Sequence, residues 1–183
     1  MTPYELPEAT LLLGRKFRLN TDFRRVLTVI GYLQDPELPA LYRMKTALAL
    51  FYREEVPKEA EQAALAYLMW FLSGGQEASP GPRLMDWQQD AAAILSDVSR
   101  VAGRDVRADE KLHWWSFLTL YQGVGQGQLS LLVTIRDKLR RGQKLEGWEQ
   151  RFYRENPDAV RLRPRETKQQ REQRLAAEKL LEG

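Results

Sequence analysis

The chain has 183 residues and no cysteine, which excludes disulfide bonds, thiolate metal sites and a cysteine nucleophile. The chain has 28 Lys/Arg and 25 Asp/Glu residues. Seven of the basic and four of the acidic residues lie in residues 161–183, so residues 1–160 contain 21 of each. The net charge of +3 therefore belongs to the tail. Phosphate backbones are bound by basic side chains concentrated on one surface, so this distribution argues against nucleic acid as the partner.

Membrane insertion and export are also not expected. The longest strongly apolar stretch, Leu65–Leu72, has eight residues, whereas a spanning helix needs about 20. The first seven residues contain two prolines and no basic region before an apolar stretch, unlike a secretory signal. We therefore expect a protein that stays inside the cell and has no membrane partner.

Residues 10–19 predict a short β-hairpin. Two apolar runs, Thr10–Leu13 and Phe17–Leu19, flank Gly14, which tolerates the positive φ of a tight turn. Two strands alone are marginally stable, so we expect the hairpin to lie on helices.

Three helices separated by prolines are predicted next. The first follows the capping residues 20–22 and ends at Asp35-Pro36, and its apolar residues recur with helical spacing at Phe23, Val26, Leu27 and Ile30. The second starts near Pro39, with an apolar face formed by Leu41, Met44, Leu48 and Phe51. The third has Pro57 in its first turn and runs to Ser73.

A turn-rich loop over Gly74–Arg83 separates these helices from the next one. Asp86 and Gln89 resemble a capping pair that opens a helix ending at Gly103. The apolar residues of that helix share one face: Trp87, Ala91, Ile94, Val98 and Val101.

An aromatic-rich helix is expected to start at Asp109 and to be buried nearly all round, because seven of the ten residues 112–121 are apolar. Three glycines over 123–127 break the chain before a helix over Gln128–Arg141. A short helix closed by Asn156-Pro157 contains Leu145, Trp148 and Phe152. Beyond Pro164, the charged residues 165–183 predict a solvated helix or a segment that stays disordered until it is bound.

The fold class expected from these elements is mainly α: a compact multi-helix domain with a short N-terminal β-hairpin and a C-terminal charged helix or tail. We place the helical domain at residues 1–160 and the basic tail at 161–183.

The sequence offers little catalytic chemistry. His113 is the only histidine, and we expect a buried, hydrogen-bonded imidazole between helices rather than a catalytic base or a metal ligand. The glycines of 123–128 do not have dinucleotide-binding spacing and follow a predicted helix instead of a strand. We therefore predict no enzyme activity, no cofactor and no metal. The five tryptophans are expected to pack in the core: Trp70, Trp87, Trp114, Trp115 and Trp148.

Four short motifs occur in a fixed order: Thr21-Asp22-Phe23-Arg24, Leu50-Phe51, Asp86-Trp87-Gln88-Gln89-Asp90 and Leu112-His113-Trp114-Trp115-Ser116-Phe117. With these motifs the chain resembles a bacteriophage family, gene product fifteen, over about residues 6–140. The sequence departs from the family pattern at Ser73-Gly74, where relatives often carry Cys-Gly. Residues 142–183 have no counterpart that we can place.

The resemblance implies a protein encoded just ahead of the tape measure gene of a long-tailed phage or prophage, which is the position of a tail assembly chaperone. Such a chaperone acts in the host bacterial cytoplasm, where it binds the tape measure protein until tail tube subunits displace it, and self-association along the tape measure would fit that role. The alternatives are a minor tail or connector protein retained in the virion and, less favoured, a nucleic-acid-binding accessory.

The resemblance assigns no catalytic residue. The residues that carry the family motifs and the expected core are Asp22, Phe23, Asp86, Trp87, His113, Trp114, Trp115 and Phe117. The alternating charges of the tail are typical of a helix that binds a protein. The tail residues expected to contact a partner are Arg165, Arg171, Arg174 and Leu175.

Overall fold

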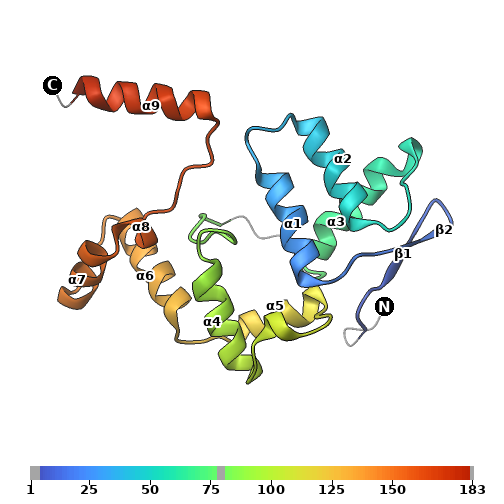
Figure 1. The fold of residues 1–183 in the computed structure, drawn as a ribbon, viewed down its shortest axis with the longest axis horizontal. Helices are drawn as coiled ribbons and strands as arrows, with labels where there is room; N and C mark the ends of the chain where they lie inside the picture. Colours follow the sequence, from blue (N-terminus) through green and yellow to red (C-terminus); the bar gives the residue numbers. More distant parts are fainter. Residues whose placement is uncertain (1–4, 78–80, 182–183) are drawn as a thin grey trace.

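The structure, a computed structural model, describes residues 5–77 and 81–181, with side chains to Ala177. Over this part of the chain it is 58% helical, with nine α-helices and one two-stranded antiparallel sheet. The elements form an elongated molecule, with the hairpin at one end and the last three helices at the other (Figure 1). The predicted mainly α-helical fold with an N-terminal hairpin is confirmed.

The hairpin consists of β1 (Ala9–Leu12) and β2 (Arg15–Arg18). Its two-residue turn, Leu13-Gly14, has φ angles of 49° and 78°, the left-handed conformation that suits the twist of a tight hairpin. Phe17 is buried and anchors the sheet to the helices, as expected. The turn itself projects away from the body (Figure 1).

Three helices follow in the predicted order, but Pro57 precedes a 3-10 turn instead of lying in the first turn of the third helix. They are α1 (Phe23–Gln34), α2 (Ala40–Phe51) and α3 (Glu61–Leu72), the last preceded by the 3-10 turn η1 (Lys58–Ala60). Helix α2 packs against both α1 and α3. The apolar face predicted for α2 is only partly right. The buried residues of α2 all lie in its second half, and Leu41 in its first turn is 61% exposed.

The predicted loop over 74–83 follows α3, and its residues 78–80 lie outside the described residues. Helix α4 (Ala91–Ala102) starts later than expected. The Asp86 carboxylate accepts hydrogen bonds from the backbone N–H groups of Gln88 and Gln89, so it caps a turn over 87–90 instead of the helix. The Gln89 amide does not complete a capping box, because it donates to the carbonyl oxygens of residues 158 and 161.

The expectation that the aromatic helix starts at Asp109 is wrong. After the 3-10 turn η2 (Val106–Ala108), α5 spans Trp114–Gln122. The Asp109 carboxylate is held by the guanidinium of Arg104 at 2.9 Å, so it is not available as a cap. The backbone is extended at Asp109 and again at His113, after which α5 begins.

Helix α5 is also less enclosed than its composition predicted. Trp114 and Phe117 are buried, whereas Leu118, Leu120 and Tyr121 are only half-buried. The reason is that α5 packs against α4 and α1 and not against a complete ring of neighbours. One side of this apolar helix therefore lies near the surface.

Three helices complete the body: α6 (Gln128–Arg140), α7 (Gly147–Glu155) and the short α8 (Pro157–Val160). Helix α8 was not predicted, because Asn156-Pro157 ends α7 and at once starts a new helical turn. Trp148 of α7 is 53% exposed, which corrects its expected place in the core.

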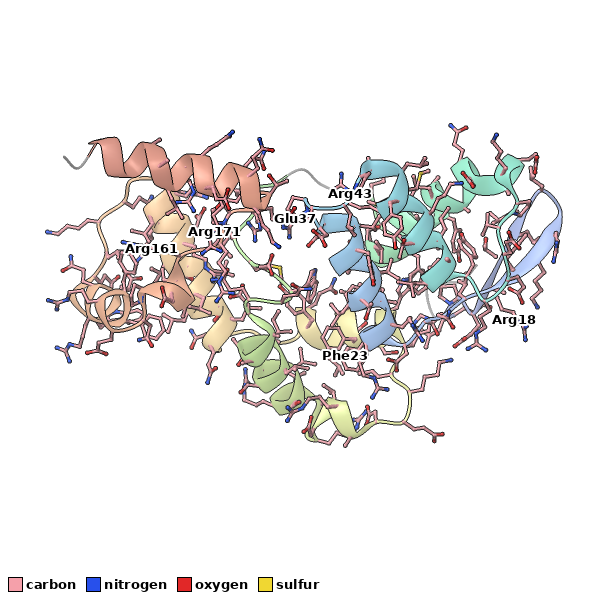
Figure 2. The ribbon with its side chains drawn as sticks, turned by 45° about the horizontal axis from the view of Figure 1, so that its top comes forward. Arg18, Phe23, Glu37, Arg43, Arg161 and Arg171 are labelled. Atoms are coloured by element: carbon pink, nitrogen blue, oxygen red, sulfur yellow. The ribbon has the colours of Figure 1, made fainter. Side chains whose placement is uncertain are left out.

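The charged tail forms α9 (Lys168–Leu181), reached through an extended connector over 161–167. Of the two forms predicted for this tail, the structure shows the helix. Helix α9 stands beside the body and runs away from α1 (Figure 1). Its backbone N–H at Lys168 donates to the carboxylate of Glu37, which ties its first turn to the segment between α1 and α2 (Figure 2).

Candidate functional site

Helices α1 and α5 begin at the same point in space. The backbone N–H of Phe23 donates to the carbonyl oxygen of Leu112 at 2.9 Å, and that of Trp114 donates to the carbonyl oxygen of Thr21 at 2.7 Å. The Asp22 carboxylate caps α1 through the Arg24 N–H at 3.0 Å. Two of the family motifs are thus joined into one junction.

His113 caps α5. Its Nδ1 accepts the backbone N–H of Trp115 at 3.1 Å, so Nε2 carries the proton and donates to the carbonyl oxygen of Pro7 at 3.2 Å. Burial lowers the pKa of the imidazole below its ordinary value, and it outweighs the opposing effect of the bond to Pro7. Both ring nitrogens are used by the backbone, which leaves none to act as a base toward a ligand.

The two tryptophans after His113 close the end of another helix. The indole N–H of Trp114 donates to the carbonyl oxygen of Leu72 at 3.1 Å, and that of Trp115 donates to Phe71 at 2.9 Å. These carbonyls belong to the last turn of α3, where a helix has no internal donors of its own. The His-Trp-Trp motif therefore caps α5 and the end of α3 together.

Aromatic rings connect this junction to α4. Phe23 stacks on Phe117 with centroids 4.6 Å apart, and Trp87 contacts Trp114 edge-on at 5.4 Å. The structure thus brings together seven of the eight motif residues predicted from the sequence. The eighth, Asp86, lies elsewhere.

Asp86 lies at the other end of α1, beside the connector to α9. Its carboxylate binds the guanidinium groups of Arg83 at 2.7 Å and Arg165 at 3.2 Å. Burial raises the pKa of this carboxyl, but the N–H of Gln89 and the two arginines outweigh burial and lower the pKa to about 2. Asp86 is therefore a charged anchor for the start of the tail.

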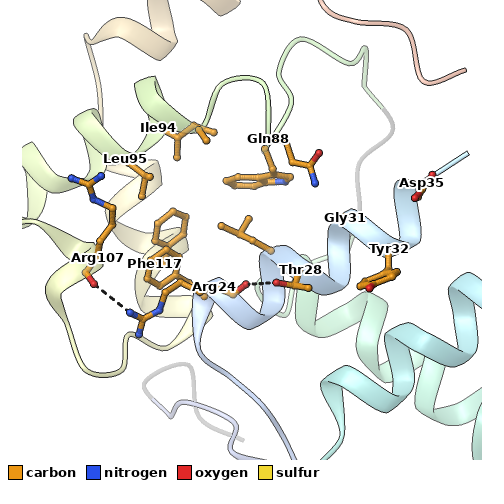
Figure 3. Close-up of a pocket in the computed structure, with 14 residues that line it drawn as sticks. Arg24, Thr28, Gly31, Tyr32, Asp35, Gln88, Ile94, Leu95, Arg107 and Phe117 are labelled. Carbon is orange, nitrogen blue, oxygen red and sulfur yellow. Dashed lines mark hydrogen bonds between the residues drawn. The ribbon is translucent and has the colours of Figure 1, made fainter. Parts of the chain in front are cut away.

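Between these two ends runs an open groove of about 890 Å³, bounded by α1 on one side and by α4 with its preceding turn on the other. We call it the α1–α4 groove (Figure 3). Its apolar floor and walls are formed by Phe23, Leu27, Tyr32, Trp87, Ala91, Ile94, Leu95 and Phe117. Sequence reasoning missed it, because the two helices lie far apart in the chain and each has an ordinary apolar face.

Charged side chains lie at both ends of the groove, and the two arginines at one end are already paired: Arg24 with Asp22 at 2.8 Å and Arg107 with Asp105 at 2.7 Å. Arg24 and Arg107 lie at the end near the α1–α5 junction, and Asp35 lies at the other end (Figure 3). In the middle, Gly31 has no side chain, and an added Cβ there would come within 3.1 Å of the Gln88 amide nitrogen. A glycine inside a helix costs stability relative to alanine. Here it keeps the groove open.

The tail residues proposed as partner contacts are not equally free. Arg165 is held by Gln34 at 2.6 Å in addition to Asp86, and Arg174 by Glu166 at 2.8 Å. Arg171 lines a hollow between the connector and α9 (Figure 2). Leu175 is 42% exposed.

The backbone N–H groups that follow the glycine-rich turn, at the start of α6, are bound by a carboxylate of the protein itself. The Asp97 carboxylate accepts the N–H of Leu129 at 2.9 Å and that of Gln128 at 3.3 Å. This helix start therefore has its own anion already in place. Within the described residues, no group of three or more histidine, aspartate or glutamate side chains is arranged to hold a metal ion. None of the helices in the described ranges has the length and hydropathy needed to cross a bilayer.

Searches of curated proteins and of solved structures found no match. A protein-family model does match, and it covers residues 4–162. The match extends beyond the 6–140 range of the resemblance, so it includes α7 and α8 and stops shortly before α9. The chain therefore belongs to the family described as bacteriophage Gp15 protein.

Proposed function

We propose that this bacteriophage protein is a tail assembly chaperone that binds amphipathic helices of the tape measure protein in the α1–α4 groove. The observation that carries the proposal is the groove itself, an open, apolar channel between two helices in a phage protein. Amphipathic helices bind to other proteins by laying their apolar face into channels of this kind. In this proposal the protein acts in the host cytoplasm, without catalysis, and tail tube subunits later displace it.

The dimensions of the groove support a helical occupant. Its α1 wall runs from Phe23 to Asp35, which corresponds to about 18 Å, or roughly three helical turns. Four of the residues that line this wall recur every four positions and so form one row, inclined to the helix axis: Phe23, Leu27, Gly31 and Asp35. An apolar face of three turns is a repeating feature of a long helical protein, so one groove could bind at many positions along it.

Coexpression with the tape measure protein of the same phage, followed by copurification, tests the proposal. Leu95→Arg and Thr28→Arg place a long charged side chain in the groove, and we expect each to reduce recovery of the tape measure at least tenfold. Thr28 is exposed, so its substitution should leave the fold intact. Val101→Arg is the matched control, because Val101 is 37% exposed on α4 and does not line the groove.

Equal recovery with all three variants would refute the groove as the binding site. Mass spectrometry of purified virions separates the proposal from its alternative. A chaperone is absent from finished particles, whereas a minor tail or connector protein is present in stoichiometric amount.

A further inference from the structure

A second hollow, of about 330 Å³, continues the α1–α4 groove beneath the connector to α9. Gly31, Gln88 and Asp35 lie toward this end of the groove (Figure 3). Another side of the hollow is formed by residues 164–166 of the connector. Five residues line both spaces, so the two adjoin: Leu27, Gly31, Asp35, Trp87 and Gln88. The tail of the chain thus borders one end of the groove, the Asp35 end.

The two ends of the groove are held together in different ways. Near the α1–α5 junction, α5 packs against both α1 and α4 and so joins the two walls. At the Asp35 end, the walls are joined by the guanidinium of Arg165. One of its terminal nitrogens, Nη2, donates to the side-chain oxygen of Gln34 at 2.6 Å and to the carboxylate of Asp86 at 3.2 Å. One side chain of the tail therefore links the α1 wall to the α4 wall.

Both partners of Arg165 are fixed to helices that form the groove walls. Gln34 is the last residue of α1. Asp86 belongs to the turn before α4, and its backbone N–H donates to the carboxylate of Asp90 at 2.8 Å. Asp90 is in turn held by the buried guanidinium of Arg136 at 2.7 Å. The position of Arg165 is therefore coupled to the separation of α1 and α4.

Arg163, two positions earlier in the connector, is attached in another way. Its backbone N–H donates to the side-chain oxygen of Gln89 at 2.9 Å, and its carbonyl oxygen accepts from Arg83 at 2.8 Å. Its side chain is exposed and lines the hollow between the connector and α9. Removing this side chain leaves the backbone bonds of the connector in place. Arg163 is therefore the matched control for Arg165.

We propose that Arg165 is a positioning residue that sets the separation of α1 and α4 at the Asp35 end of the groove. The inference rests on the proposed function, in which a tape measure helix binds between these walls. A link that resists both opening and closing fixes the width of the groove before the partner arrives, and a preorganised site binds more tightly. Arg165 lies beyond residues 4–162, which the family model matches, so the link comes from the tail.

Pulsed electron spin resonance measures the separation of the walls without any partner. The chain has no cysteine, so the pair Tyr32→Cys and Ala92→Cys places one spin label on α1 and one on α4, at exposed positions. Arg165→Ala should broaden the distribution of distances between the labels about twofold, because the freed walls sample several separations. Gln34→Ala should have the same effect. The double variant should add nothing, since either substitution removes the link.

Arg163→Ala should leave the distribution unchanged. Circular dichroism should show that each variant melts within a few degrees of the unmodified protein, because the contacts of Arg165 are near the surface. An unchanged distribution in Arg165→Ala or in Gln34→Ala overturns the proposal. Equal broadening in Arg163→Ala also overturns it, because any loss of charge from the connector would then be enough.

Coexpression with the tape measure protein gives the consequence for binding. Arg165→Ala should reduce recovery of the tape measure about fivefold, since only a fraction of the molecules then has a groove of the width that binds. Arg163→Ala should recover as much tape measure as the unmodified protein.

The two proposals fail separately. If Arg165→Ala broadens the distribution while Leu95→Arg and Thr28→Arg still bind the tape measure, the proposed function fails and Arg165 still sets the separation of the walls. If these groove variants lose the tape measure while Arg165→Ala recovers it in full, the proposed function stands and the positioning role of Arg165 in binding is overturned.

Discussion

His113 connects helix α5 to the N-terminal segment through its two ring nitrogens. It caps α5 through Nδ1 and fixes the N-terminal segment through the Pro7 carbonyl. The capping bond needs a lone pair on Nδ1, and protonation removes that lone pair. The stability of the junction therefore depends on the neutral ring.

A pH dependence follows from this. The pKa of His113 is lowered in the folded state, so the unfolded chain takes up the proton at a higher pH. The contribution of the neutral ring is fully present above the ordinary histidine pKa of about 6.5 and is lost as pH falls through the lower folded pKa. Urea unfolding at pH 7.5 and 5.5 should show lower stability at the lower pH. In His113→Asn, which accepts the Trp115 N–H without titrating, the difference should shrink, and an unchanged difference would contradict the assignment.

Arg136 is the second residue on which much of the structure depends. Its guanidinium binds the Asp90 carboxylate at 2.7 and 2.8 Å and donates to the carbonyl oxygens of Leu84, Ala159 and Val160. Both side chains of the ion pair are at least 96% buried. This cluster joins α4, α6 and α8.

We expect Arg136→Ala to lower the free energy of unfolding by roughly 3–5 kcal/mol, because it leaves the Asp90 carboxylate buried and unpaired. The double variant Arg136→Met/Asp90→Leu should recover most of this loss, since it removes both charges. Urea denaturation of the three proteins measures the difference. A loss below about 1 kcal/mol in the single variant would show that water reaches Asp90.

At the scale of single residues, the sequence predicts which side chains are buried better than it predicts their partners. A lone histidine within an apolar segment indicated a buried imidazole. Nothing in the local pattern identifies Pro7 as its partner, because 106 positions separate the two residues. The same holds for Arg136, because nothing in the local pattern identifies Asp90, 46 positions away, as its partner.

At the scale of elements, the starts of α1 and α6 were predicted well, although Asp97 caps α6 from a distance, and the starts of α4 and α5 were not. Asp22 caps α1 from the adjacent position, and the start of α1 was foreseen. Helix α5 starts where a bridge to residue 22 ends, and Asp86 caps a turn instead of α4. Periodicity locates the middle of a helix, whereas its first residue here depends on tertiary contacts.

The start of α6 offers a test of such a distant cap. A Cβ at Gly127 would lie 2.4 Å from the carboxylate of Asp97. The φ of Gly127 is −170°, an extended value open to any residue, so the contact alone makes glycine necessary. Gly127→Ala should push Asp97 off the N–H of Leu129 and lower the free energy of unfolding by about 1–3 kcal/mol.

Gly147→Ala is the control for this substitution. An added Cβ at Gly147, in the first turn of α7, meets nothing within 4 Å. Alanine is the better helix former, so thermal melting should show equal or higher stability. If both substitutions have the same effect, the contact with Asp97 is not the reason for glycine at 127.

At the scale of the whole molecule, the body is expected to fold without its tail. The continuous hydrophobic core runs from Leu12 to Val160, and the family match ends at residue 162. A chain that ends at Pro164 should keep its helical circular dichroism and melt within a few degrees of the full chain, because the lost contacts of Arg165 and Lys168 are near the surface. Aggregation or a broad transition would show that the tail is part of the fold.

The helical class and hairpin of the whole molecule could be predicted from the sequence, but its groove could not. Each wall is an ordinary amphipathic stripe, and a single helix with one apolar face is expected to bury it. Only the tertiary arrangement leaves the space between α1 and α4 open. The form of the tail was also undecided, because its composition is typical both of a solvated helix and of a segment that folds on binding.

The shared starting point of α1 and α5 also constrains the order in which the chain can fold. The bonds that hold this junction join residues 90 positions apart, such as Asp22 and Leu112. Closing a loop of that length has a high entropic cost, which slows the formation of such contacts. During synthesis, α1, α2 and α3 emerge from the ribosome well before His113, Trp114 and Trp115. The indole bonds to the carbonyl oxygens of Phe71 and Leu72 at the end of α3 therefore form only after the middle of the protein has been made.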